Sequence, residues 1–547
     1  MAKINVYINE EKYDFDEGIT LLEITNKLGL DHIMAAFINN EIVPLDNKLT
    51  EDTNIIFVPT SNYVGNRIYQ KGLLFVLIYA FKELFGYGYY VKACHSIDKA
   101  IKIKTNLELN STRINALKDK MREIIEADMP IKKCTVSRKE ARNYFLDIKN
   151  ESKADTFIYN TNSFITLYKL GDMYDYFFSK MPVSTGMVKD FDLYMLDNYN
   201  FVLQFPYLND DGKIPEYVDR NLIIKAFDED YKLATRLGIF NSGDLNKTAT
   251  DGTASDVIKL TELVASARLL ELAKDISDKR DKIKLVLISG PSCSGKTTTS
   301  RKLAMYLKIF GLNPKYLSID DYFLDREKTP KFENGDYNFE SVEAINTEQL
   351  NKDLSKMLNG EEVEVPSFNF IKGISEYEGK TIKLESRDIL IMEGIHAINE
   401  ELTSLVDKEK KYKVYVSPLT DLNIDDHNMI SNNDLRLLRR IIRDNRTRGY
   451  SAEDTIASWR RVRDGEEKYL FPYQNDVDYV YNTSLIYEIG VLKLFAEPLL
   501  FGIDNSSLYY EEVIRLLNFL DMFVGLPTDE IPNDSILREF IGSSYFE

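Results

Sequence analysis

The chain has 547 residues, of which 44% are hydrophobic and 29% are charged, and this balance excludes a disordered or fibrous protein. Its 87 acidic residues outnumber its 69 basic residues, and the net charge of −18 disfavours nonspecific nucleic-acid binding by the surface as a whole. The length is too great for one hydrophobic core and indicates about three to four domains.

Cysteine and histidine are scarce. The three cysteines, Cys94, Cys134 and Cys293, exclude a disulfide framework and disfavour a cysteine-rich zinc module. The four histidines are far apart in the sequence, so we do not expect a multi-histidine metal site. No apolar run approaches the roughly 18 residues of a membrane span, and charges stand where a secretion signal would be apolar. We therefore expect a cytoplasmic protein without a membrane contact.

The first 60 residues combine strand-like and helix-like patterns. Strand-like segments at 4–8, 35–42 and 54–60 surround a helix-like segment at 20–29, and polar turns separate them. The pattern predicts a β-grasp domain over residues 1–60. This stretch resembles the ubiquitin-like TGS domain found at the front of threonyl-tRNA synthetases.

The next region resembles the second N-terminal domain of the same synthetases, an α+β editing domain, in segments 115–130, 136–142 and 183–186. In that family the domain hydrolyses mischarged tRNA with an HxxxH pair and a CxxxH pair. Here the first pair should fall between Tyr69 and Leu74, where no histidine occurs, and the second at Phe177 and Met181. The resemblance implies an editing-like domain over residues 61–235 whose metal ligands are absent. Whether it contacts RNA or has become an interaction module stays open.

A helical pattern leads from this region into the second half of the chain. Apolar residues recur at helical spacing from Ala254 to Ile276, so we expect a helical connector over residues 236–282. Beyond Ile283, short apolar runs alternate with helical stretches, which is typical of a parallel α/β sheet. The pattern predicts an α/β domain at 283–490 and a helical tail at 491–547, to which no function is assigned.

A phosphate-binding loop opens this α/β domain. The apolar strand Leu285–Ser289 runs into GPSCSGKT and then into a helical stretch, which is GxxxxGK[ST] in the context that the motif requires. Such a loop directs backbone N–H groups at phosphate oxygens, its lysine neutralises the β- and γ-phosphates of ATP, and its threonine binds Mg²⁺. The predicted nucleotide-binding residues are Gly290, Ser292, Cys293, Ser294, Gly295, Lys296, Thr297 and Thr298.

Two further apolar strands end in acidic residues. The strand at 316–319 runs into Asp320 and Asp321, and we expect it to lie next to the phosphate-loop strand, where a carboxylate can accept the proton of an attacking hydroxyl. A solvated loop carboxylate is the alternative. The strand at 389–392 ends in Glu393, which we expect to reach the metal ion that Thr297 holds.

Nine arginines follow between residues 436 and 463. Such a run is usually a solvated helix face. Its position after the other phosphate-loop elements favours instead a lid that closes over phosphates, where guanidinium groups stabilise the transferring group.

These motifs together resemble the phosphoribulokinase/uridine kinase family over residues 283–490, and most closely its uridine-cytidine kinases. The matching segments are 290–297, 318–323, 337–345, 366–370, 388–397 and 439–449. The resemblance implies that Asp320 is the catalytic base and that Lys296 and Arg448 stabilise charge. It implies Mg²⁺ at Thr297 and Glu393. The implied substrate-binding residues are Asp320, Glu340, Phe368, Arg440 and Arg443.

Three departures from the family concern the nucleobase pocket. Phe323 and Phe368 stand where tyrosines are expected, and Gly373 stands where a base-contacting histidine is expected. A pocket without these donors discriminates weakly between bases. We expect a Mg-ATP-dependent kinase that phosphorylates the 5′-hydroxyl of a small-molecule nucleoside. The alternatives are a kinase for RNA or another small hydroxyl compound, with the N-terminal domains docking RNA, and a nucleotide-gated regulatory protein.

Overall fold

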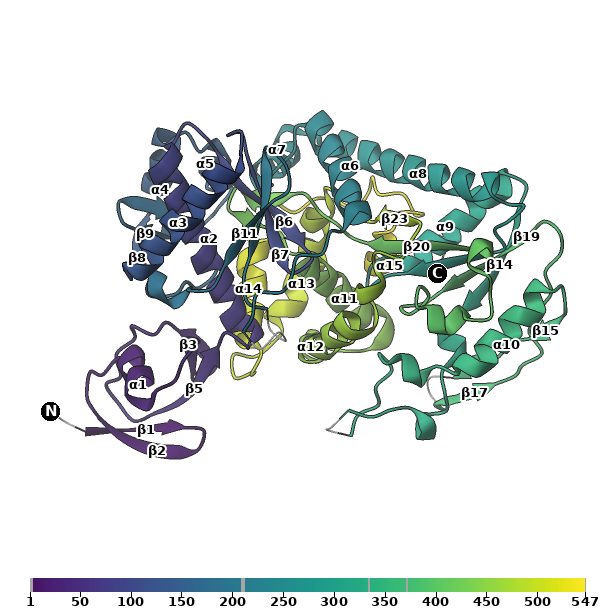
Figure 1. Cartoon of the computed structure of the whole chain (residues 1–547), viewed down its shortest axis with the longest axis horizontal. Helices are drawn as coiled ribbons and strands as arrows, with labels where there is room; N and C mark the ends of the chain where they lie inside the picture. Colours follow the sequence, from purple (N-terminus) through teal and green to yellow (C-terminus); the bar gives the residue numbers. More distant parts are fainter. Residues whose placement is uncertain (1–2, 208–211, 333–334, 370–371, 547) are drawn as a thin grey trace.

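The computed structural model describes residues 3–207, 212–332, 335–369 and 372–546, and therefore omits Phe370 of the 366–370 segment. The molecule is elongated: the N-terminal sheet lies at one end, the sheet that carries the phosphate-binding loop lies toward the other, and the long helix α8 (Ala254–Asp278) runs along one side (Figure 1). No helix in the described ranges is long and apolar enough to cross a membrane.

Residues 3–59 form a mixed five-stranded sheet covered by one helix. The strand order is β2-β1-β5-β3-β4, and β1 pairs with β5 in parallel. The helix begins at Thr20, whose hydroxyl and backbone N–H form a capping box with Glu23. The sequence pattern did not indicate β2. The elements are β1 (Lys3–Ile8), β2 (Glu11–Asp16), α1 (Leu21–Leu28), β3 (Ile33–Ile38), β4 (Glu41–Val43) and β5 (Thr53–Pro59).

The second part packs two antiparallel sheets around the buried helix α2. One sheet has the order β11-β12-β7-β6 and the other β10-β9-β8. Phe177 and Met181, at the expected positions of the CxxxH pair, are buried in one apolar cluster with Tyr69 and Leu74. The elements are α2 (Tyr63–Phe85), β6 (Val91–Ile97), β7 (Ala100–Thr105), α3 (Ser111–Glu126), β8 (Lys132–Ser137), α4 (Arg138–Asp147), α5 (Glu151–Thr156), β9 (Phe164–Leu170), β10 (Met173–Asp175), β11 (Asp192–Met195) and β12 (Asn200–Gln204).

Helices α6 (Asn221–Leu237), α7 (Ser242–Asp251) and α8 then lead into a parallel sheet of order β14-β19-β13-β20-β23. The expectation that the strand before Asp320 lies directly beside the phosphate-loop strand is wrong, because β19 lies between β14 and β13. The strands and long helices of this part are β13 (Leu285–Ser289), α9 (Lys296–Ile309), β14 (Asn313–Ser318), α10 (Thr347–Leu358), β15 (Val363–Glu364), β16 (Ser367–Asn369), β17 (Ile374–Glu376), β18 (Thr381–Ile382), β19 (Asp388–Glu393), β20 (Lys411–Ser417), β21 (Asn423–Asp425), β22 (Asn428–Met429), α11 (Asn432–Arg448), α12 (Ala452–Tyr469), β23 (Tyr479–Asn482) and α13 (Glu488–Phe501).

The C-terminal tail joins the parts of the molecule. Helix α14 (Tyr510–Leu520) lies between α2 and α13 (Figure 1), and α15 (Arg538–Ile541) packs against α11. A chain of ion pairs crosses this junction, from Arg67 of α2 to Glu512 at 3.2 Å, then through Arg515 to Asp434 at the start of α11 at 2.7 Å. The tail is therefore part of the packed structure.

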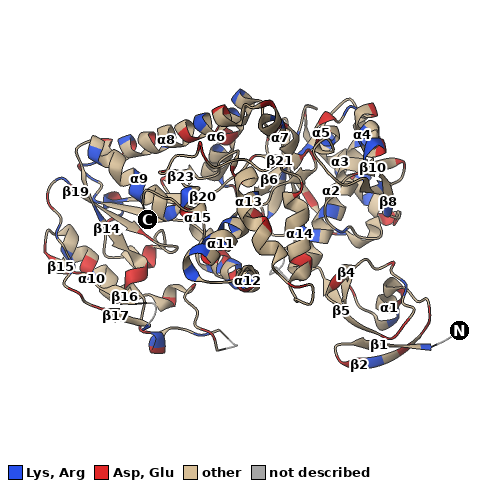
Figure 2. Cartoon of the chain, turned by 180° about the vertical axis from the view of Figure 1, so that it is seen from behind, with Lys and Arg blue, Asp and Glu red and all other residues tan. Residues whose placement is uncertain are grey.

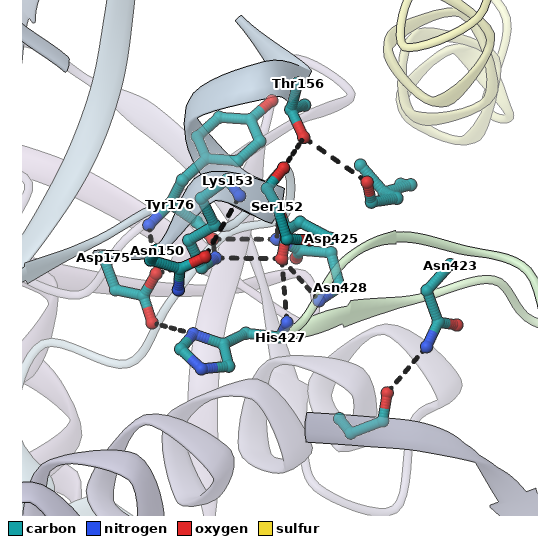
Figure 3. A network of polar contacts seen from close by, with 12 residues as sticks. Asn150, Ser152, Lys153, Thr156, Asp175, Tyr176, Asn423, Asp425, His427 and Asn428 are labelled. Carbon is teal, nitrogen blue, oxygen red and sulfur yellow. Dashed lines mark hydrogen bonds and ion pairs between the residues drawn. The ribbon is translucent and has the colours of Figure 1, made fainter. Parts of the chain in front are cut away.

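A buried polar network also connects the second part with the parallel-sheet part (Figure 3). Lys153 Nζ lies 2.7 Å from Asp175 Oδ1 and 3.0 Å from Asp425 Oδ1, and His427 Nδ1 lies 2.6 Å from Asp175 Oδ2. Asp425 and His427 belong to the β21–β22 hairpin, which inserts between β20 and α11 in the sequence. Breaking a buried pair of this kind costs about 3–5 kcal/mol, so the hairpin fixes the two parts to each other.

Candidate active site

The phosphate-binding loop connects β13 to α9. A Cβ at Gly290 would lie 2.0 Å from the carbonyl oxygen of Val416, so no larger residue fits there. Gly295 and Cys293 have φ angles of +83° and +60°, a left-handed conformation that turns successive N–H groups into one concavity. The nucleotide-binding role of residues 290–298 stays a prediction, and these backbone constraints support it.

Lys296 extends over this loop from the first turn of α9. Its Nζ donates hydrogen bonds to the carbonyl oxygens of Gly290 and Pro291, at 2.9 and 3.0 Å. Burial lowers the pKa of Lys296, while Glu393 and then Asp320 act in the opposite direction. The ammonium thus lies among the loop carbonyls and two acidic groups, where the phosphates of a nucleotide would engage it.

A buried carboxylate, which the sequence analysis did not single out, caps the loop. Glu466 Oε1 accepts a hydrogen bond from the backbone N–H of Ser292 at 2.8 Å, and Arg436 holds both carboxylate oxygens at 2.6 and 2.8 Å. Arg439 is also buried and lies 2.7 Å from Glu488. The hypothesis that the whole arginine run forms a mobile lid is wrong for Arg436 and Arg439, because a buried ion pair holds each of them in place.

Thr297 and Glu393 meet at the tip of β19. The hydroxyl of Thr297 lies 3.3 and 3.4 Å from the two carboxylate oxygens of Glu393. Burial raises the pKa of Glu393 to about 7, and the Lys296 charge opposes this rise. A hydroxyl and a carboxylate side by side at a phosphate-binding loop are the oxygen ligands that Mg²⁺ prefers, so these residues fit the ion.

Asp320 and Asp321 lie in a short 3₁₀ turn, Ile319–Tyr322, directly after β14. Burial raises the pKa of Asp320, Lys296 opposes this rise, and Asp321 adds to it. Asp321 instead faces Lys380, 3.8 Å away. The two acids therefore differ in surroundings, and Asp320 is the one that shares the electrostatic environment of Lys296.

The candidate acceptor-binding residues include Glu340, whose pKa the charges of Lys296 and Asp320 influence. Glu340 is half-buried, and its Oε2 has no hydrogen-bond partner among the described residues. Burial and then the Glu466 charge raise the pKa of Glu340 to about 7. The rings of Phe323, Phe339 and Phe368 form one wall, with centroids 5.3 to 6.3 Å apart. An unsatisfied carboxyl oxygen beside an aromatic wall suits a ligand that carries both hydroxyl groups and a planar ring.

Arg326 was not indicated by the sequence and occupies space that Gly373 leaves open. Gly373 has a φ of +70°, and a Cβ there would lie 2.6 Å from Arg326 Nε. A histidine at position 373 would thus displace this guanidinium.

The remaining predicted arginines surround Asp444 near the end of α11, a helix rich in basic residues in Figure 2. Arg440 and Arg443 lie 3.2 and 2.7 Å from its carboxylate, and the half-exposed Arg448 lies 3.6 Å away. Arg440 also donates to the Ser292 hydroxyl at 3.1 Å. Arg440 is thus in place at the loop, whereas Arg448 is the most exposed of the three.

The C-terminal tail lies against the phosphate-binding loop. Glu539 Oε2 accepts hydrogen bonds from the hydroxyl and backbone N–H of Thr298, at 2.7 and 3.3 Å. A Cβ at Gly295 would lie 2.6 Å from Ile536. A carboxylate of the chain itself therefore sits at the N-terminus of α9, on groups that the sequence analysis assigns to the nucleotide.

We expect Glu539→Gln to lower the Kd for ATP by about five- to tenfold, because a neutral amide competes less well than a carboxylate for the α9 N-terminus. Calorimetric titration with ATP measures this. Glu530→Gln, in the same tail but paired with Lys259 on the surface, is the matched control and should leave the Kd unchanged. Weaker ATP binding in Glu539→Gln would contradict a competing role.

Comparison with known proteins identifies the family. The family model "Phosphoribulokinase / Uridine kinase family" matches residues 285–485. A uridine kinase of Staphylococcus haemolyticus (strain JCSC1435) is 32% identical over 179 residues, which are 32% of this chain and 76% of the relative. The chain belongs to the phosphoribulokinase/uridine kinase family.

A second relative and a solved structure are also similar to this chain. A uridine kinase of Staphylococcus epidermidis (strain ATCC 35984) is 30% identical over 198 residues, covering 36% of this chain and 86% of that protein. A solved structure described as a possible uridine kinase from Bacillus stearothermophilus is 20% identical, with a TM-score of 0.24, and covers 38% of this chain and 100% of its own. As a phosphoribulokinase/uridine kinase family member, the protein is an ATP-dependent kinase. The family match spans β13 to β23, and residues 1–284 lie outside it.

Proposed function

We propose that the protein is a Mg-ATP-dependent nucleoside kinase that phosphorylates the ribose 5′-hydroxyl. The observation that carries this proposal is the unsatisfied Glu340 oxygen beside the phenylalanine wall, because vicinal ribose hydroxyls would donate to it. The uridine kinases among its relatives support a nucleoside acceptor. Phe368 contributes apolar contact to the base, without a hydrogen bond.

The site residues then divide the work of phosphoryl transfer. Asp320 accepts the proton of the attacking hydroxyl, and Lys296 holds the β- and γ-phosphates. Arg440, Arg443 and Arg448 neutralise charge that develops on the transferring group. Thr297 and Glu393 would hold Mg²⁺, which supplies further charge neutralisation when bound.

A nucleoside panel tests this assignment. With Mg-ATP, the ribonucleosides should be accepted with weak discrimination between bases, since Phe323 and Phe368 offer no donors to them. A 5′-deoxynucleoside should not be an acceptor. Transfer to total tRNA but to no nucleoside would favour the RNA kinase alternative, and ATP binding without any phosphorylated product would favour the regulatory alternative.

We further propose that residues 1–60 are a TGS-like module, that residues 61–235 are an editing-like domain without metal chemistry, and that residues 236–282 connect them to the kinase at 283–490. The mixed strand order of the first sheet and the apolar burial of Phe177 and Met181 support this. RNA contact by these domains stays an alternative.

The front module should be inert as a deacylase, because side chains at the positions of the CxxxH pair are apolar. We expect elemental analysis to find no stoichiometric zinc. We also expect mischarged threonine tRNA to persist when it is incubated with the protein. Zinc at one ion per chain, or hydrolysis that survives chelator treatment, would refute this.

A further inference from the structure

A large cavity lies between the front module and the kinase, apart from the candidate acceptor-binding residues. Its volume is about 850 Å³, within the range of ligand-binding sites and ample for a nucleotide. One side is formed by α2 and by residues at the turn between β6 and β7, and the other by the start of α11, one face of α12 and the end of β20. Gly465 of α12 lies close to Glu340. The α12 residues that line the cavity are Arg460, Asp464 and Lys468, among others. The cavity and Glu340 therefore lie on different faces of this helix.

The cavity is basic, in contrast to the chain. Nine arginines and lysines line it against four aspartates and glutamates, whereas the whole chain carries a charge of −18. Each of the four acids is paired within the wall: Asp98 with Arg220, Asp434 with Arg515, Asp464 with Arg460 and Glu467 with Arg463. Of the other cations in the lining, Arg67 and Arg436 pair with Glu512 and Glu466, which lie outside it.

Lys71 is a buried cation of this lining. Its side chain is buried, with 8% exposure, and its Nζ makes no ion pair or hydrogen bond with any described residue. Its Nζ lies 5.9 and 5.6 Å from the ring centroids of Phe177 and Phe178. Two nearby acids, Asp175 and Asp425, belong to the network of Figure 3 and are held there by Lys153 and His427.

Two further polar groups beside Lys71 are unsatisfied. Arg67 precedes Lys71 by one turn of α2 and lines the same cavity, and its Nη1 is buried without a hydrogen-bond partner among the described residues. The buried Ser179 hydroxyl, also in the lining, lacks a partner too. Burial lowers the pKa of Lys71 to about 8; the Asp425 charge opposes this lowering, and the Lys153 and Arg67 charges add to it. A multivalent anion would satisfy all three groups at once.

The remaining wall suits an aromatic ring. Seven tyrosines and phenylalanines line the cavity, including Phe178 next to Lys71 and Tyr207, whose hydroxyl donates to Glu467. We propose that this cavity is a second ligand site, and that it takes a nucleotide whose phosphate lies at Arg67, Lys71 and Ser179 and whose base lies against these rings. A mononucleotide fits the volume, and the acidic surface of the chain opposes the approach of a long polyanion such as RNA.

An occupied cavity would act on the phosphate-binding loop. Arg436 lines the cavity and holds Glu466, which caps the N–H of Ser292, and Pro291 of the loop is itself part of the wall. The ring of Trp459, the only tryptophan, lies 5.1 Å from Arg436. A bound nucleotide that redirects Arg436 is therefore expected to change both Trp459 fluorescence and the affinity for ATP.

Calorimetric titration with uridine monophosphate tests the site in a full-length Lys296→Ala, Glu340→Gln double variant, in which the kinase pocket is disabled. We expect one uridine monophosphate per chain, with a change in Trp459 emission. Adding Lys71→Met should weaken this binding at least about tenfold, because it removes the buried charge. Adding Lys82→Met, on α2 outside this cavity, should not.

Stability separates a binding role from a structural one. Without ligand, Lys71→Met should melt at or above the temperature of the parent, since it replaces an unpaired buried ammonium by an apolar chain of similar length. Three results would overturn the proposal. They are unchanged binding of uridine monophosphate after Lys71→Met, no binding of uridine monophosphate to the double variant, and binding of total tRNA that uridine monophosphate does not displace.

Discussion

Asp320→Asn is expected to lower kcat by roughly 10²- to 10⁴-fold while ATP binding survives, because the amide keeps the size of the side chain but cannot accept a proton. Steady-state kinetics and ATP titration measure the two effects separately. The pKa of Asp320 is raised by burial, so the wild-type kcat/KM should fall as the pH drops through that raised value and the carboxylate becomes protonated. This acidic limb should be lost in Asp320→Asn.

Asp321→Asn is the matched control. It changes the neighbouring residue in the same 3₁₀ turn, but Asp321 faces Lys380 at 3.8 Å and does not share the surroundings of Lys296. We expect its kcat to stay near that of the wild type. If Asp321→Asn is inactive and Asp320→Asn turns over normally, the base has been assigned to the wrong member of the pair.

Lys296→Ala is expected to impair ATP binding and phosphoryl transfer together, lowering kcat/KM by at least roughly 100-fold. The ammonium lies over the loop carbonyls of Gly290 and Pro291, in position to follow the phosphates. Its removal deletes the charge that holds the β- and γ-phosphates in the ground state and in the transition state. The Kd for ATP and the single-turnover rate should both change.

Lys302→Ala provides the control for helix α9. Lys302 lies on the same helix but pairs with Asp534 of the tail, at 3.0 Å, away from the loop carbonyls. It should reduce stability more than turnover. An unaltered Kd for ATP in Lys296→Ala would show that this lysine does not engage the phosphates.

The local patterns that place the phosphate chemistry could be read from the sequence. The strand, loop and helix around Gly290, the acid after β14 and the acid that ends β19 depend on short-range periodicity and motif spacing, which one chain segment carries by itself. The order of the strands depends on contacts between distant segments, and for this reason the expected neighbourhood of β14 and β13 was wrong. Only the packed sheet shows that β19 lies between them.

Residues whose partners lie far away in the sequence could not be predicted either, because no local pattern marks them. Glu466 lies 174 residues from Ser292, and Glu539 lies 241 residues from Thr298, and no periodic pattern links such pairs. The arginine run illustrates the opposite error. The density of arginines favoured a single lid. Arg436 and Arg439, however, are buried and paired with Glu466 and Glu488, respectively. They differ in this from the arginines that lie around Asp444.

The identity of the phosphorylated atom tests the central claim most directly. Wild-type protein, Mg-ATP and uridine should yield ADP and uridine 5′-monophosphate in equal amounts, with the new phosphate assigned to the 5′-oxygen by ³¹P and ¹H NMR. Asp320→Asn should form the same product at a rate lower by roughly 10²- to 10⁴-fold. ADP formation without any phosphorylated nucleoside across the panel, or phosphate on a hydroxyl other than the 5′, would contradict the proposed function.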